Sequence, residues 1–378
     1  MSSHGQNSRR WSQLPRDPKG YDFVWIPFGK TVTPVSHVCK LAASGFAFSG
    51  KMEIEIKTLS PLHISDGTLR LSEELGFKKG FVVKSILCPE SPIIPGTTLK
   101  GVARTYYEAI TKSCVSQFLR RMKARYVEDD RGASSLPQEL VRQIVAAGGE
   151  KRGMAEVAIL PECFERIERC PPVRKRSSRL CPACLLFGTK GFVGRVVFSD
   201  ARLVSSPQKG EFLYVLPSGA PHLHKIGQVS VAPGTRSAKL LVEKLKGRKV
   251  YNAKYEPNTP SQEAELWDYV PSGAVFSAQI VFHDVSLAEM GGLFGCLGID
   301  RKMALSIGGG KSSGLGKISI SSGELLAFPS GLMQWSSFEQ RRPMDDRRGF
   351  IKQCKASFIR SVFAYPKSYE MLKKICAV

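Results

Sequence analysis

Two segments of this chain alternate apolar and polar residues with the period of a β-strand, and this pattern limits the folds open to it. One segment is KMEIEIK (51–57) and the other is AVFSAQIVFH (274–283). Side chains two residues apart lie on one face of a strand, so each segment predicts a half-buried strand. The apolar faces consist of Met52, Ile54 and Ile56 in the first segment, and Phe276, Ala278, Ile280 and Phe282 in the second. Each face must be buried against another layer of structure.

A helical pattern follows each predicted strand, and a further strand follows each helix. In the first half, Thr97 or Thr98 is expected to cap a helix after PIIPG (92–96). In the second half, Ser286 and Glu289 have the spacing of a capping box. The apolar stripes are Leu99, Val102, Ala103, Tyr106 and Ile110 in the first helix, and Leu287, Met290, Phe294 and Leu297 in the second. Further strands are expected at 194–203 and 318–321. Two strand–helix–strand units side by side predict an α+β fold with a ferredoxin-like or RRM-like core.

Changes in composition divide the 378 residues into five expected parts. The segment 113–190 combines basic tracts, a Gly/Ser/Pro stretch and a cysteine cluster, and we interpret it as an insertion between the two units. The parts are an N-terminal arm (1–48), the first half of the core (49–112) with a long loop at 65–91, the insertion (113–190), the second half of the core (191–325) and a C-terminal segment (326–378). Within the last part, 351–376 is expected to form a short helix that docks on a partner.

The charge of the chain predicts a polyanionic partner. There are 55 Lys and Arg residues against 33 Asp and Glu residues, which gives a formal net charge of +22. Nucleic acid is the first candidate, because phosphates are neutralised by Lys and Arg with release of counterions. An anionic membrane surface is the second, but the chain lacks a basic amphipathic helix with a large apolar face.

Targeting signals and cysteine usage predict a cytoplasmic protein. No apolar run approaches the roughly 18 residues of a membrane span, and the N-terminal residues have no apolar signal region. Thiols stay reduced in the cytosol, so the ten cysteines are expected to be buried apolar residues or metal ligands.

Four of these cysteines fall within 22 residues: Cys163, Cys170, Cys181 and Cys184. The last two form C-x-x-C, a spacing that lets two thiolates bind one tetrahedral Zn²⁺ at about 2.3 Å. We therefore predict a structural zinc ion that holds a short, polar insertion together. Four thiolates leave no open position for catalysis. The alternative is four unrelated buried cysteines, and three other residues could replace Cys163 as the fourth ligand: His222, His224 and Cys88.

A glycine-rich loop, GGGKSSGLGK (308–317), is a candidate phosphate-binding element. It is not a Walker A motif, because Leu305 stands where that motif needs glycine. It is not a Rossmann fingerprint either, because it follows a helix and precedes a strand. Bare backbone can present N–H groups to phosphate oxygens, and Lys311 and Lys317 add charge. The alternative is a flexible surface loop.

Two further segments are candidate RNA contacts. Cations alternate with Tyr251 and Tyr255 in one of them, and such a pattern suits single-stranded RNA, whose bases stack on aromatic rings. Its cations are Lys239, Lys244, Lys246, Arg248, Lys249 and Lys254. The other is the helix start at Thr97, Thr98 and Lys100, because helix N-termini attract phosphate. A solvated helix face and simple capping are the respective alternatives.

Four blocks of the sequence, in this order, resemble the RAMP superfamily of CRISPR backbone subunits. They are PLHISDG (61–67), PIIPGTTLKGVAR (92–104), CPACLLFGTKGFVGRVVFSDARL (181–203) and GGGKSSGLGKI (308–318). YDFVWIPF (21–28) and GRKVYNAKY (247–255) resemble the larger members from type III-D and type VII systems. The resemblance implies a modified RRM fold that polymerises along guide RNA. It also implies a thumb-like hairpin, within 65–91, that wedges between guide and target bases.

One departure from the family pattern bears on catalysis. Relatives that cut target RNA carry an aspartate in the loop before the PIIPG motif, and here the matching position is Lys79. A cation cannot hold a metal ion or activate a 2′-hydroxyl, so we expect a subunit without catalytic residues, with cleavage supplied by a separate nuclease. The alternative is a metal-dependent endoribonuclease that uses a carboxylate of the 66–74 loop: Asp66, Glu73 or Glu74. A third hypothesis, a guide-processing enzyme, has little support from six scattered histidines.

The expected partners are guide RNA, target RNA, further copies of the chain and other CRISPR effector subunits, with no membrane. The residues expected to contact RNA are His63, Lys78, Lys79, Thr97, Thr98, Lys100, Arg104, Lys246, Arg248, Lys249, Tyr251, Gly309, Gly310, Lys311, Ser312 and Ser313.

Overall fold

The computed structural model describes the chain in segments. They are 20–26, 47–71, 82–86, 88–114, 121–128, 136, 138–159, 170, 180–207, 212–215, 227–231, 239–252, 254–256, 265–299, 303–330 and 345–378. No helix in these segments is long and apolar enough to span a bilayer.

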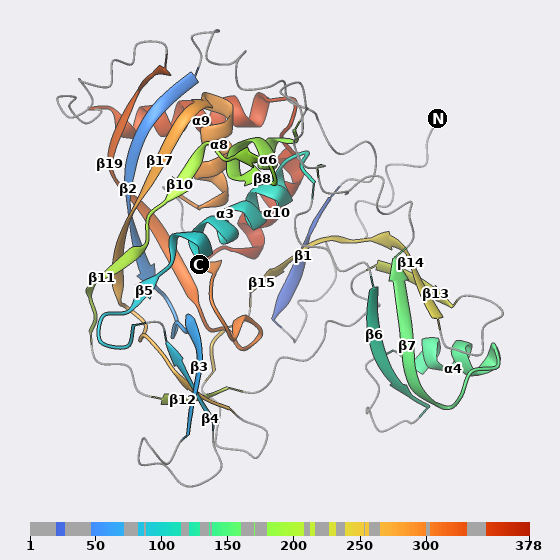
Figure 1. Ribbon diagram of the computed structural model, residues 1–378. Helices are drawn as coiled ribbons and strands as arrows, with labels where there is room; N and C mark the ends of the chain where they lie inside the picture. The colour runs from blue at the N-terminus through green and yellow to red at the C-terminus, as the bar shows by residue number, and fades with distance from the viewer. Residues whose placement is uncertain are drawn as a thin grey trace.

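A seven-stranded sheet forms the centre of the molecule (Figure 1). Its order is β18 (Leu305–Ser306), β19 (Lys317–Pro329), β2 (Ala47–Thr58), β17 (Val275–Ser286), β11 (Ala201–Ser205) and β5 (Ile93–Ile94), with β10 (Val196–Phe198) also paired to β17. The two strands predicted from alternation, β2 and β17, are central neighbours and antiparallel, with Ile54 opposite Ala278. The strand expected at 194–203 is interrupted at Ser199 and Asp200, so two short strands replace it.

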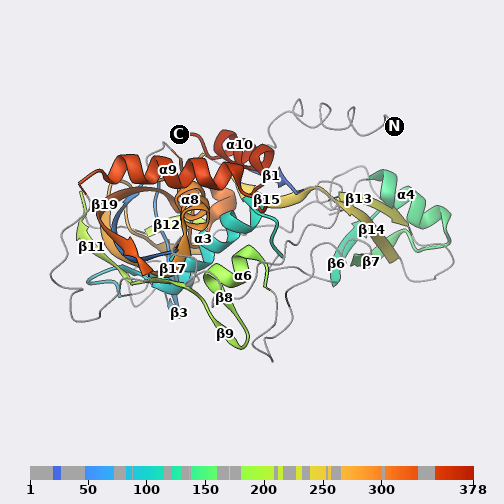
Figure 2. The same cartoon turned by 90° about the horizontal axis from the view of Figure 1, so that it is seen from above.

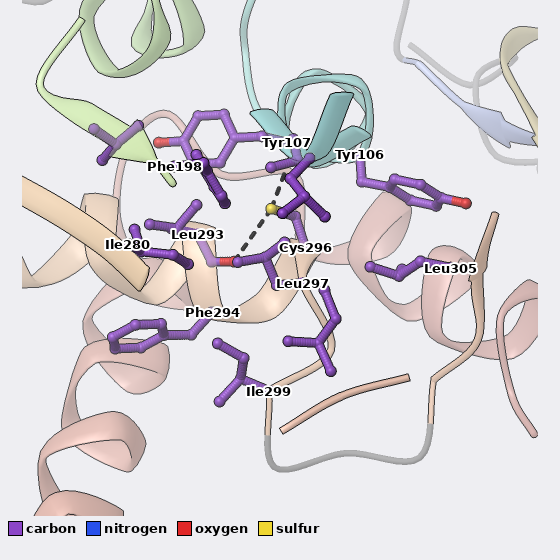
Figure 3. Close-up of a cluster of buried hydrophobic side chains, with 14 of the residues drawn as sticks. Tyr106, Tyr107, Phe198, Ile280, Leu293, Phe294, Cys296, Leu297, Ile299 and Leu305 are labelled. Carbon is purple, nitrogen blue, oxygen red and sulfur yellow. Dashed lines mark hydrogen bonds between the residues drawn. The ribbon is translucent and has the colours of Figure 1, made fainter. Parts of the chain in front are cut away.

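Helices cover one face of this sheet, as predicted. Both expected helices are present, as α3 (Gly96–Ile110) and α8 (Leu287–Cys296), and their apolar stripes face the sheet core. Figure 3 shows where they meet, around Cys296. The Cys296 thiol donates to the carbonyl oxygens of Ala103 on α3 (3.4 Å) and Leu293 on α8 (3.2 Å).

The two helix starts differ from each other in how they are capped. The capping box of Ser286 and Glu289 is confirmed, with both reciprocal hydrogen bonds present. The predicted threonine cap of α3 is wrong, because the N-cap residue is Pro95, whose side chain makes no capping hydrogen bond. Instead the Asp200 carboxylate accepts from the Gly96 N–H at 2.7 Å. A Cβ at Gly96 would lie 2.1 Å from the Phe198 carbonyl oxygen, so only glycine lets this helix start approach β10.

A second sheet has the order β12 (Phe212–Val215), β16 (Glu265–Asp268), β4 (Val82–Ile86) and β3 (Ser65–Leu71), and lies below the first in Figure 1. The hairpin β3–β4 comes from the long loop predicted at 65–91. Its partner strands come from the second half of the chain, with β4 parallel to β16.

A third sheet forms a lobe that projects from the core, as Figures 1 and 2 both show. It contains β13 (Gly227–Val231), β14 (Lys239–Leu245), β7 (Arg152–Ile159) and β6 (Arg121–Val127), together with α4 (Gln138–Ala146). The segment 113–190 is thus divided. Its strands β6 and β7 join strands from 227–245 in the lobe. Its last part, with α6 (Pro182–Phe187) and β8 (Gly188–Thr189), belongs to the core, where β8 pairs with β9 (Phe192–Val193) just beyond the segment.

The first described strand and the C-terminal helices are attached to the core. β1 (Tyr21–Trp25) pairs with β15 (Gly247–Tyr251), and the Ser368 hydroxyl of α10 donates to the Trp25 carbonyl oxygen at 2.7 Å. The C-terminal residues form two helices, α9 (Arg347–Arg360) and α10 (Pro366–Ile375), rather than the one expected. Their apolar side chains, including Phe358 and Tyr369, are buried against α8 and α3 of the same chain.

A close contact between α8 and α9 generates a stability prediction. A Cβ at Gly291 would lie 1.9 Å from the Cys354 carbonyl oxygen. Gly291→Ala is therefore expected to lower the free energy of unfolding by about 1–3 kcal/mol, because the two helices would have to move apart. Chemical denaturation measures this change.

Gly101 is the matched control, because it lies on the exposed side of α3 and a Cβ there meets nothing within 4 Å. Gly101→Ala is expected to stabilise the protein by about 0.5–1 kcal/mol through helix propensity. A Gly291→Ala variant as stable as Gly101→Ala would contradict the helix contact.

Candidate metal centre and nucleic-acid interface

Four cysteine sulfurs meet beside α6 and form a candidate metal centre. Cys114, Cys170, Cys181 and Cys184 place all their Sγ atoms within 4.8 Å of one another. The Cys114 Sγ lies 3.5 Å from the Sγ atoms of both Cys181 and Cys184. A tetrahedral ion with Zn–S bonds of about 2.3 Å holds its sulfurs about 3.8 Å apart, so this spacing fits a four-thiolate site.

Local structure explains how CPAC brings two of these sulfurs together. Cys181 is the N-cap of α6, and its Sγ accepts from the Cys184 N–H at 3.4 Å. Pro182 occupies the first helical turn, where its missing N–H is not needed. The Ala183 N–H donates to the Ser113 hydroxyl at 3.0 Å, which ties α6 to the residue before Cys114.

Cys114 is the member of the cysteine cluster that the sequence prediction missed. Cys163, the predicted fourth ligand, lies outside the described residues, as do its alternatives His222 and His224, and Cys88 is exposed and not in the cluster. Among the described residues, the fourth member of the cluster is Cys114, which follows the end of α3. Cys114 is far from the CPAC motif in sequence, and its one local signal is its place directly after a buried helix.

The sulfur cluster is electrostatically suited to a cation. Hydrogen bonds from Cys114, Cys170 and Cys181 lower the pKa of the Cys184 thiol, and the Arg104 guanidinium lowers it further. Hydrogen bonding to Cys114 and the other sulfurs, with burial, raises the pKa of the Cys181 thiol. Four sulfurs this close cannot all ionise unless a cation compensates their charge, and a divalent metal ion supplies that charge.

A buried carboxylate connects this centre to β15. Glu108 on α3 has a fully buried side chain and lies between two arginines. Its Oε1 accepts from Arg104 Nε at 2.7 Å, and its Oε2 lies 3.7 Å from an Nη atom of Arg248. Arg104 also donates to the Cys184 Sγ at 3.3 Å and to the Gly188 carbonyl oxygen at 2.7 Å. Arg104 and Arg248, both predicted RNA contacts, thus have internal partners.

The glycine-rich loop is a fixed turn between β18 and β19, unlike the flexible loop considered as its alternative. Its glycines 308, 310, 314 and 316 all have positive φ, which other residues rarely adopt. The Gly309 N–H donates to the His63 carbonyl oxygen (2.9 Å), and the Gly316 N–H to that of Pro61 (2.8 Å). The PLHISDG block therefore packs against this loop and accepts two of its backbone hydrogen bonds.

Lysines of this loop differ in their surroundings. The Lys317 ammonium donates to the Tyr251 carbonyl oxygen at 2.7 Å, which joins the loop to β15. Lys311 lies in the short 3₁₀ turn η2 (Lys311–Ser313), where burial lowers its pKa. The N–H groups of Gly310 and Lys311 have no hydrogen-bond partner among the described residues.

The remaining predicted RNA contacts are distributed over several elements of the structure. His63 is buried, with Nδ1 2.7 Å from the Asp268 carbonyl oxygen. Lys249 Nζ lies 4.0 Å from the ring centroid of Tyr21 and 4.4 Å from that of Tyr251. Thr97, Thr98 and Lys100 are in the first turn of α3, and Lys246 lies between β14 and β15. Lys78 and Lys79 are outside the described residues.

Comparison with known proteins adds three findings. The family model of the RAMP superfamily matches residues 55–319. No curated protein matches the chain. Among solved structures, a chain of the cryo-EM structure of the Type III-B Cmr-beta bound to cognate target RNA aligns at 14% identity with a TM-score of 0.31. The alignment covers 77% of this chain and 64% of that chain, which is less than two thirds of its length.

The position of Glu108 generates a second stability prediction. Glu108→Ala is expected to lower the free energy of unfolding by about 3–5 kcal/mol, because it leaves two largely buried guanidinium groups, on side chains that are 15% and 11% exposed, without their carboxylate. Glu139→Ala is the control, since Glu139 is exposed and lies 3.9 Å from Arg142 on α4. That variant is expected to change stability by about 0–1 kcal/mol. Equal effects in chemical denaturation would show that the Glu108 contacts contribute little.

Proposed function

The chain belongs to the RAMP superfamily, and from that premise we propose that it is an RNA-binding backbone subunit of a class 1 CRISPR effector complex. In this role it polymerises along guide RNA and positions target RNA without cutting it. A type III-D or type VII complex is the proposed setting, with other effector subunits as neighbours and a separate nuclease for cleavage.

The formal net charge of +22 in a RAMP protein is the observation that carries the proposal. Such a charge favours a partner with regularly spaced phosphates. The glycine-rich loop supports phosphate contact, because it holds Lys311 and the N–H groups of Gly310 and Lys311 in one fixed turn. Because burial lowers the pKa of Lys311, a nearby phosphate would stabilise its charged form.

The proposed lack of cleavage rests on Lys79, which stands where cutting relatives keep an acid. Of the alternative carboxylates, Glu73 and Glu74 lie outside the described residues. Asp66 lies in β3, where its Oδ1 accepts from the N–H and the hydroxyl of Thr68, each at 2.7 Å. A carboxylate used in such a local turn has a structural role, which favours the non-cleaving proposal. The hairpin β3–β4 would be the thumb that contacts guide and target bases.

We also propose that the four-cysteine centre holds a structural Zn²⁺. Four thiolates match the preference of structural zinc sites, and no ligand position is left for a substrate. Bound there, the ion would supply positive charge that compensates the thiolates and links the end of α3 to α6.

Binding and cleavage of single-stranded RNA test the function. With a labelled single strand, the affinity of the full chain is expected to fall steeply as salt rises, because phosphate contacts release counterions. Lys311→Ala is expected to reduce the slope of log K against log salt by about 0.7, the value for one phosphate of a single strand. After incubation with Mg²⁺ the RNA is expected to remain intact.

Lys352→Ala is the control for this slope, because Lys352 is exposed on α9. A flat salt dependence would argue against a phosphate-dominated site. Regular cleavage of target RNA that Asp66→Ala abolishes would establish the endoribonuclease alternative instead.

Metal content tests the zinc proposal. Purified protein is expected to carry about one zinc ion per chain, and Cys114→Ser is expected to lose most of it because one of four ligands is removed. Cys88→Ser is the control, since Cys88 is an exposed thiol outside the cluster. Cys163→Ser is expected to keep its zinc. Loss of zinc from Cys163→Ser but not from Cys114→Ser would reverse the ligand assignment.

A further inference from the structure

A cluster of aromatic side chains beside the glycine-rich loop has no role in the function proposed above. Tyr255, Trp267 and Tyr269 are each partly exposed, and they pack against a buried trio of Leu213, Val215 and Leu315. We propose that these three rings form a platform on which an unpaired base of single-stranded RNA stacks. This inference rests on the proposed RNA-binding function and adds to it the means by which a base is held.

Trp267 is the most firmly held of the three rings. Its Nε1–H donates to the Glu265 carboxylate at 2.9 Å, and its ring centroid lies 4.6 Å from that of His63. It also lies directly over Gly309, where a Cβ would be 2.7 Å from Trp267 Cζ3. A ring that is held in place in the free protein loses little conformational entropy when a base stacks on it.

The glycine-rich loop also contacts the segment that carries Tyr255, the second ring of the platform. A Cβ at Gly314 would lie 2.4 Å from the Lys254 carbonyl oxygen and from the Tyr255 nitrogen, so this segment rests on the loop backbone. Tyr255 and Tyr269 both pack against the buried trio of Leu213, Val215 and Leu315, and burial raises the pKa of Tyr255. The segments 254–256 and 265–269 thus meet the loop at 308–317, which is distant from both in sequence.

Cations border these rings, which favours nucleic acid over an apolar protein partner. Lys254 is exposed next to Tyr255, and Lys311 lies in the loop whose Gly309 is covered by Trp267. Aromatic faces take bases of any sequence, and neighbouring ammonium groups take the phosphates.

The open face of the main sheet lacks the features that would make it the stacking surface. RRM domains stack bases on aromatic residues of their central strands. Here β2 and β17 present no Phe, Tyr or Trp at their outward positions, which are Lys51, Glu53, Glu55, Lys57, Val275, Ser277, Gln279, Val281 and His283. The imidazole of His283 lies beside the bulge that interrupts the pairing of β17 with β2. Carboxylates at the middle of that face would repel phosphates, so base stacking is better served beside the loop.

Tryptophan fluorescence tests the platform directly. The chain has four tryptophans, so replacing Trp11, Trp25 and Trp335 by phenylalanine leaves Trp267 as the reporter. A single-stranded RNA is expected to quench its emission, whereas an abasic strand of equal length and charge is expected to leave the emission unchanged. Quenching by both strands would overturn the proposal, because charge alone would then explain the change.

Affinity for the same RNA gives an independent measurement. Trp267→Ala is expected to weaken binding by about 5- to 150-fold, the range for one stacked base, whereas Trp267→Phe keeps most of the affinity. Trp25→Phe is the control, because Trp25 lies on β1, away from the loop, and is expected to bind as the unsubstituted chain does.

The outcomes separate this inference from the function on which it rests. Salt-sensitive RNA binding with unchanged Trp267 emission and full affinity of Trp267→Ala would reject the platform and leave the RNA-binding function standing. Absence of any RNA binding would overturn the function itself. A shift of Trp267 emission on addition of partner subunits without RNA would identify a protein contact and overturn the platform.

Discussion

The antiparallel pairing of β2 with β17 is the interaction on which the other features of this protein depend. Each strand buries one apolar face under α3 and α8, and the register places Ile54 opposite Ala278 and Ile56 opposite Phe276. This pairing joins the two halves of the chain across a long sequence separation. Three features are positioned by segments that begin where these strands or their helices end. They are the residues after α3 that include Cys114, the PLHISDG segment that packs against the glycine-rich loop, and the hairpin β3–β4.

Two buried glutamates add ion pairs to the hydrophobic packing of the core. Glu108 holds two arginines between the cysteine centre and β15, and Glu289 pairs with Arg195 while it also caps α8. A buried ion pair has a large desolvation penalty, so its loss on one side is strongly destabilising. These arginines stabilise the fold, and the Lys317 ammonium donates to the Tyr251 carbonyl oxygen. In the function we propose, Lys254 and Lys311 are the lysines beside the glycine-rich loop that contact the polyanionic partner.

The open face of the main sheet and the edge beside the glycine-rich loop therefore differ in the side chains that they expose, although both belong to an RRM-like arrangement. The open face of the main sheet carries Glu53 and Glu55 and no Phe, Tyr or Trp at the outward positions of its two central strands. The edge beside the glycine-rich loop combines fixed backbone, lysines and the ring of Trp267. In the function we propose, RNA follows this edge, and the sheet serves as the support that holds it in place.

Features that depend on neighbours along the chain were predictable from residue order: the central strands, the two core helices, the capping box at Ser286 and the paired thiols of CPAC. Periodicity and spacing along the sequence indicate which side chains share one face of a helix or strand, and this depends only on nearby residues. Three features were not predictable from residue order. They are the fourth sulfur, from Cys114, the internal contacts of Arg104, and the division of the segment 113–190 between lobe and core. Each depends on which distant segments pack together, and only the folded chain brings those side chains within bonding distance.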